Sequence, residues 1–164
     1  MTLTVREAGT ELAFGIDDLN RYHGPGFPGG VAHAYKVLER TLPLLDGGAP
    51  PERREIRIDT AFGGPGARDA FELVTRGVTD GRYTVDPSLA LPERDFLARY
   101  VFRLSYRGAV VTAVVREGFV VREFIDLGAK PDKTDAEHAH LEVLKREMAD
   151  RLLSAPADEA YDVV

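Results

Sequence analysis

RYVFRLSYRGAVVTAVVREGFVVREFIDL, residues 99–127, is the stretch that decides the fold class of this chain. Valine, phenylalanine, tyrosine and isoleucine dominate three segments of it, residues 99–106, 109–116 and 119–127. An Arg-Gly pair and a Glu-Gly pair separate these segments, and such pairs supply the positive φ values that tight hairpin turns need. The stretch therefore predicts an antiparallel meander of three strands.

Helical patterns lie on both sides of this meander. Apolar side chains share one face of residues 31–45, which predicts a helix that packs on the sheet. Residues 16–22 and 67–76 predict two shorter helices. A threonine followed three positions later by a glutamate forms a capping box, which predicts the start of a C-terminal amphipathic helix over residues 134–153.

Two further strands are expected between these helices. Residues 54–62 alternate isoleucine with polar side chains, as a half-buried strand does, and residues 83–85 are a short strand candidate. We therefore predict one α+β domain over residues 1–164. Its core is expected to span about residues 12–153, and a loose or partner-dependent tail is expected over residues 154–164.

The composition argues against several functional classes. The formal net charge is −6 and lysine and arginine do not cluster, so we expect no binding to nucleic acid or to a membrane surface. The absence of cysteine excludes disulfides, iron–sulfur ligation and thiol nucleophiles. We recognise no membrane-spanning stretch and no signal peptide, and we expect a cytoplasmic location.

LNRYHGPGFPGG, residues 19–30, and GARDAFELVTRGVTDGRYTV, residues 66–85, carry a family resemblance. The first is similar to the His-Gly-His-x-Cys-Pro-Gly turn of the FmdE family, which takes its name from a component of formylmethanofuran dehydrogenase. The second is similar to that family's Cys-x-x-Asp-Ala segment. The resemblance covers about residues 16–85. The matching positions are His23, Gly24, Pro28, Gly29, Asp69, Ala70, Thr75 and Gly81.

The departures from the family pattern concern its metal ligands. The second histidine of the family falls on Pro25, and its two cysteines fall on Phe27 and Gly66. The ligand set that the resemblance implies is thus reduced to His23, whereas stable zinc sites use three or four protein ligands. We therefore expect no metal in the family manner and no other cofactor. A metal site completed by carboxylates or by a second subunit stays an alternative.

The resemblance also implies helices packed on a mixed, largely antiparallel sheet, a homodimer, and a pocket between two glycine-rich turns. We expect this pocket to bind, and as a further hypothesis to transform, a small polar or anionic metabolite. The second turn opens a helix whose free amide groups favour an anion, although a purely structural turn is the alternative. The candidate ligand-binding residues are Gly24, Gly26, Phe27, Gly29, Gly63, Gly64, Gly66 and Arg68.

His23 is the candidate catalytic acid or base, because imidazole titrates near neutrality, and Asp59 or Asp69 is expected to orient it. The structural alternatives are a histidine that caps the preceding helix and an acid that favours a helix N-terminus. We expect His33 to be exposed or at an oligomer contact. Whether the chain is an enzyme stays open, and a non-catalytic accessory or scaffold subunit is the competing interpretation.

Overall fold

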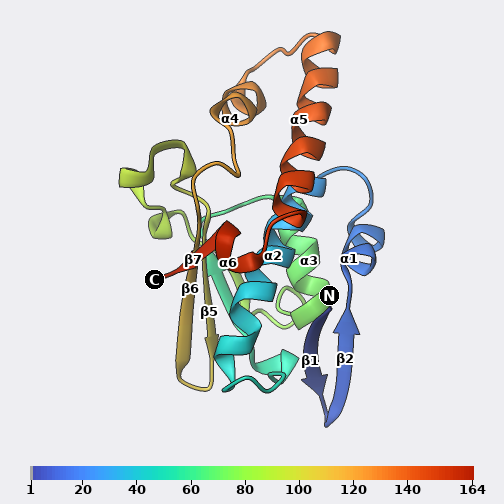
Figure 1. The fold of residues 1–164 in the computed structure, drawn as a ribbon, viewed down its shortest axis with the longest axis vertical. Helices are drawn as coiled ribbons and strands as arrows, with labels where there is room; N and C mark the ends of the chain where they lie inside the picture. Colours follow the sequence, from blue (N-terminus) through green and yellow to red (C-terminus); the bar gives the residue numbers. More distant parts are fainter. Residues whose placement is uncertain (1) are drawn as a thin grey trace.

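The computed structural model describes residues 2–164 and consists of helices packed against one face of a five-stranded sheet, with a separate two-stranded hairpin (Figure 1). Short 3₁₀ helices connect some of the elements. In chain order the elements are β1 (Leu3–Glu7), β2 (Thr10–Phe14), α1 (Ile16–His23), α2 (Pro28–Leu45), η1 (Arg53–Glu55), β3 (Arg57–Thr60), α3 (Pro65–Thr75), β4 (Tyr83–Val85), η2 (Pro87–Leu89), η3 (Pro92–Leu97), β5 (Val101–Tyr106), β6 (Ala109–Val115), α4 (Arg122–Ala129), α5 (Asp135–Leu153), α6 (Ala157–Ala160) and β7 (Tyr161–Val163).

The five strands are arranged in the order β4-β3-β5-β6-β7. Only β3 and β4 run parallel to each other, and every other neighbouring pair is antiparallel. This confirms the predicted α+β class with a mixed, largely antiparallel sheet. The register places Ile58 beside Leu104 and Leu104 beside Val111, and all three side chains are buried against the helices.

The hairpin between β5 and β6 forms where the sequence predicts it. Arg107 and Gly108 both have positive φ, 46° and 85°, as a two-residue hairpin turn of this kind requires. Tyr106 and Ala109 close the hairpin as its last paired residues. The Arg-Gly pair therefore sets the register of the two central strands.

The prediction of a third strand in the meander is wrong. β6 ends at Val115, and most of the segment expected to follow as a strand instead forms the helix α4. Two apolar pairs, Val120 with Val121 and Phe124 with Ile125, stand four residues apart in this segment. That spacing matches the period of a helix and not the alternation of a strand.

The predicted loose tail and the predicted limits of the core are also wrong. β7 pairs antiparallel with β6, and the Tyr161 side chain is fully buried. At the other end of the chain, Leu3 and Val5 of β1 are buried in the same core. Three strand residues give too short a pattern to be recognised in the sequence as a strand.

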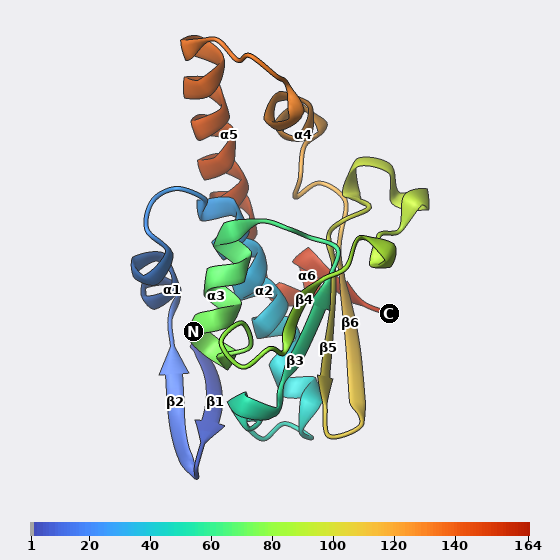
Figure 2. The ribbon, with the colours of Figure 1, turned by 180° about the vertical axis from the view of Figure 1, so that it is seen from behind.

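The predicted C-terminal amphipathic helix is confirmed as α5, and its capping box is formed by Thr134 and Glu137. Only the second half of α5 is packed in the core. Figure 2 shows the first half standing clear of the body beside α4, which has no buried residue. None of the described helices is long and apolar enough to cross a membrane.

The expectation that His33 is exposed is wrong. α2 is surrounded by α3, α5 and the sheet, so the side of the helix opposite its apolar stripe is covered as well. His33 Nδ1 shares a hydrogen bond of 2.6 Å with the Tyr161 hydroxyl, and Nε2 lies 3.4 Å from Met148 Sδ. Burial lowers the pKa of His33 to about 3. The imidazole is therefore neutral in the folded protein at physiological pH.

The depressed pKa of His33 predicts acid-sensitive stability. The unfolded chain takes up a proton near pH 6.5 while the folded chain does not, so stability is lost as the pH falls from about 6.5 towards 3. At pH 4.5 the protonation of His33 in the unfolded chain should lower the free energy of unfolding by about 3 kcal/mol relative to pH 7. Urea unfolding at pH 7 and pH 4.5 should show that His33→Leu removes this part of the acid sensitivity. The exposed His138→Leu variant should keep it, and equal pH dependence in the two variants would contradict the prediction.

Candidate functional site

The two glycine-rich turns meet at the N-termini of α2 and α3. A β-carbon added to Gly66 would collide with the carbonyl oxygen of Phe27, and one added to Gly30 would lie 3.0 Å from the backbone nitrogen of Ala67. The two helix starts are thus in direct backbone contact. Glycine is required at these positions by close approach, because neither has a positive φ.

A cavity of about 270 Å³ lies where the turns meet. The backbones of Gly29, Gly30 and Gly66 form one wall, and side chains from α4 and α5 form the opposite wall. Most of this lining is apolar. The side chains that define the cavity are Phe27, Phe62, Phe124, Leu141, Lys145 and Met148.

Both helices that begin at the cavity lack a cap. α2 and α3 each start with a proline, and among residues 2–164 no side chain caps either helix. Neither first turn contains an acidic residue. The first N–H groups of a helix have no partner within it and carry a partial positive charge. Gly29 and Gly30 of α2 and Gly66 of α3 belong to these first turns and line the cavity, so backbone amide groups of both helix starts lie in its wall.

Lys145 adds a full positive charge. Its ammonium group lies 2.8 Å from Glu142, 3.4 Å from the carbonyl oxygen of Gly26 and 4.3 Å from the centre of the Phe27 ring. The Lys145 side chain is only 13% exposed, whereas that of Glu142 is 48% exposed. These contacts hold the ammonium group over the first turn, where it can face a negative ligand.

His23 and Asp69 form the pair that the sequence suggests. His23 Nδ1 lies 2.8 Å from Asp69 Oδ2, and the imidazole is packed against Phe27 with ring centres 5.9 Å apart. The His23 side chain is 7% exposed, and its Nε2 is buried with no hydrogen-bond partner among residues 2–164. Pairing through Nδ1 leaves Nε2 as the atom available for chemistry.

The structure does not bring Asp59 to this pair. Asp59 projects from the face of the sheet opposite to the helices, where it accepts hydrogen bonds from Arg57 and lies 3.7 Å from Arg103. Its neighbour Ile58 faces the core, and alternation along β3 directs Asp59 outward. The expectation that Asp59 orients His23 is therefore wrong.

The remaining predicted residues divide between the cavity and its surroundings. Arg68 lies outside the cavity wall, with its guanidinium 3.5 Å from Asp69 and its side chain 55% exposed. Gly24 ends α1 with φ of 87°. Gly63 lies outside this cavity and lines a neighbouring one, whereas Gly64 lines both.

Lys145 is missed by the sequence reasoning although a signal for it exists. It stands four residues after Leu141 and three before Met148, so it lies on the apolar face of α5. A lysine on an apolar stripe is a buried cation that needs a partner. Phe124 is missed because its segment is expected from its valine and phenylalanine content to form a strand, whereas it forms α4.

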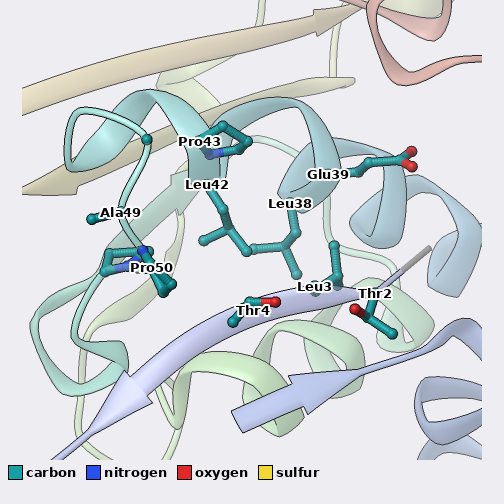
Figure 3. Close-up of a pocket in the computed structure, with 11 residues that line it drawn as sticks. Thr2, Leu3, Thr4, Leu38, Glu39, Leu42, Pro43, Ala49 and Pro50 are labelled. Atoms are coloured by element: carbon teal, nitrogen blue, oxygen red, sulfur yellow. The ribbon is translucent and has the colours of Figure 1, made fainter. Parts of the chain in front are cut away.

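A smaller hollow of about 170 Å³ lies on the far side of the core, between β1 and the end of α2 (Figure 3). Its titratable residue, Glu39, is paired with Lys36 at 2.7 Å. Leu38 and Leu42 project from α2 towards Leu3 and Thr4 in this region. This hollow presents no unpaired charge to a ligand from the residues that the structure describes.

The described residues contain no group of three or more histidine, aspartate or glutamate side chains that could hold a metal ion. Asp69 is the carboxylate that pairs with His23. The comparisons with known proteins add no assignment, since no family model and no curated protein matches this chain. The resemblance to the FmdE family therefore stays a prediction.

The contact between the turns predicts an intolerant glycine. Gly66→Ala must push the α3 backbone away from Phe27 and should lower the free energy of unfolding by about 2 kcal/mol, as overpacked sites do. Gly26→Ala is the matched control, because a β-carbon there would meet nothing within 4 Å. Urea denaturation of the two variants compares them directly. Equal stability would show that the two turns are not in contact.

Proposed function

We propose that this chain is an FmdE-like domain that binds a small organic anion with an apolar body, held between its two glycine-rich turns. The observation that carries the proposal is the cavity in which two uncapped helix N-termini and Lys145 face apolar walls. A carboxylate is stable in a largely apolar site only when hydrogen bonds and a positive charge compensate its desolvation. Here the backbone amide groups and Lys145 supply both.

The arrangement around His23 supports the family assignment within this proposal. Phe27 and Gly66 occupy the positions where the family carries cysteines, and the two residues are in contact. The imidazole of His23 is packed against Phe27. His23, Phe27 and Gly66, which stand at three of the four positions aligned with the metal ligands of the family, therefore lie close together, and this supports the proposal. In this chain the aromatic ring of Phe27 occupies part of that space.

Binding and catalysis are separate parts of the proposal. His23 Nε2 is buried, and His23 does not line the cavity. Phe27 lies between them, because its ring packs against His23 and also lines the cavity. A proton transfer between His23 and a bound anion would need the Phe27 ring to move. The closed geometry supports a binding function first, with Asp69 and His23 positioning the turn that carries Phe27.

Calorimetric titration with hexanoate and benzoate, and with their neutral amides, tests the anion site. Wild-type protein should bind the carboxylates and discriminate against the amides. Lys145→Gln should weaken carboxylate binding at least about tenfold, or about 1.4 kcal/mol, because a buried charged hydrogen bond is lost. Arg146→Gln makes the same change in charge at the next, exposed position of α5 and should leave the affinity unchanged. Equal affinity for amides and carboxylates would rule the site out.

A second candidate function is an accessory subunit that self-associates through the projecting α4–α5 hairpin. A groove between the two helices is lined by Leu127 and Ala136, and α4 buries no residue within one chain. Sedimentation velocity should then give twice the mass of one 18.0 kDa chain. Ala136→Glu should reduce the mass to one chain, and Val110→Glu, at an exposed position of β6, should not. A monomeric wild type would exclude this candidate.

A further inference from the structure

A second cavity adjoins the first beneath α4. It encloses about 720 Å³ and extends from the Gly63-Gly64 turn to the segment before β5. The two cavities share Phe62 and Gly64 from the turn region and Phe124 and Gly128 from α4. The two cavities are therefore neighbouring lobes of one groove. The Phe62 and Phe124 side chains lie at the boundary between the lobes.

The second lobe contains a cation without a partner. Arg99 lines this lobe, is exposed, and makes no side-chain hydrogen bond or ion pair with any of residues 2–164. The one carboxylate in the same wall, Asp95, is already paired with Arg122. The guanidinium of Arg99 therefore has no counter-ion among the described residues, whereas the Lys145 ammonium group is paired with Glu142.

The floor of the second lobe supplies a neutral hydrogen-bond donor. Tyr100 lines the lobe and is 3% exposed, and its hydroxyl makes no hydrogen bond with the residues that the structure describes. Burial raises the pKa of Tyr100 well above its ordinary value, so the hydroxyl keeps its proton. A protonated hydroxyl with no partner among the described residues can donate a hydrogen bond to a ligand oxygen in this lobe.

The cover of the groove is lightly attached. α4 is held at its start by Arg122, which pairs with Asp95 and lies over the Phe96 ring at 4.6 Å. Asp95 has φ of 56° and ψ of −123°, a strained conformation for a residue other than glycine. α4 has no buried residue of its own, and its contacts with the core come from the partly buried Phe124 and Ile125.

From these observations we infer that the ligand is an elongated dianion whose two negative groups lie in different lobes. One group lies at Lys145 and the helix N-termini, and the other at Arg99 and the Tyr100 hydroxyl. The apolar middle of the ligand passes between the side chains of Phe62 and Phe124. This inference rests on the proposed function, because it needs the anion site of the first lobe.

The test compares α,ω-dicarboxylates from glutarate to sebacate with monocarboxylates of equal carbon number, by calorimetric titration. Wild-type protein should bind at least one dicarboxylate about tenfold more tightly than its monocarboxylate. Arg99→Gln should abolish this advantage without weakening the monocarboxylate. Lys145→Gln should weaken both ligands. Arg146→Gln, which removes an exposed arginine outside the groove, should behave as wild type.

The outcomes separate the two proposals. If monocarboxylates bind in a manner that depends on Lys145 but no dicarboxylate gains affinity, the dianion inference is overturned and the anion site stands. An advantage that survives Arg99→Gln overturns the inference as well. If no carboxylate binds wild-type protein, both proposals fail. Arg99 is exposed and makes no side-chain contact that holds the fold, so circular dichroism should show an unchanged folded state for its variant.

Discussion

The backbone contact between the first turns of α2 and α3 is the constraint on which the rest of the structure depends. Gly66 lies against the Phe27 carbonyl, and Gly30 lies against the α3 backbone, so no side chain separates the two helices. This proximity places two uncapped N-termini side by side. Both termini carry a partial positive charge, and the Lys145 ammonium group, paired with Glu142, lies over the first turn. The anion site that we propose would use this geometry.

The sequence predicts the parts of this arrangement that depend on local signals. The Arg-Gly hairpin, the capping box at Thr134 and the glycine-rich turns each specify a backbone conformation within a few residues. The meeting of the turns is expected from the family resemblance and not from periodicity. The pairing of His23 with Asp69 is expected from the same resemblance, since both residues lie in its motifs. Asp59 lies outside those motifs, and the expectation that it contacts His23 is wrong.

The parts that the sequence does not predict are those set by tertiary packing. The valines and phenylalanine around α4 suit a strand as well as a helix, and only the four-residue spacing of the apolar pairs distinguishes the two. β7 has three residues and no periodicity to read. Since α4 covers the cavity and α5 supplies Lys145, half of the candidate site lies outside the motifs that identify the other half.

The C-terminal strand is linked to the site through one buried histidine. His33 lies on α2 within two turns of the glycine wall, and it joins Tyr161 of β7 to Met148 of α5. Met148 also lines the first cavity. Because a buried imidazole without hydrogen-bond partners is destabilising, these contacts favour one position of α2 relative to α5. The last strand of the sheet and the helix that supplies Lys145 therefore both contact α2 through the same histidine.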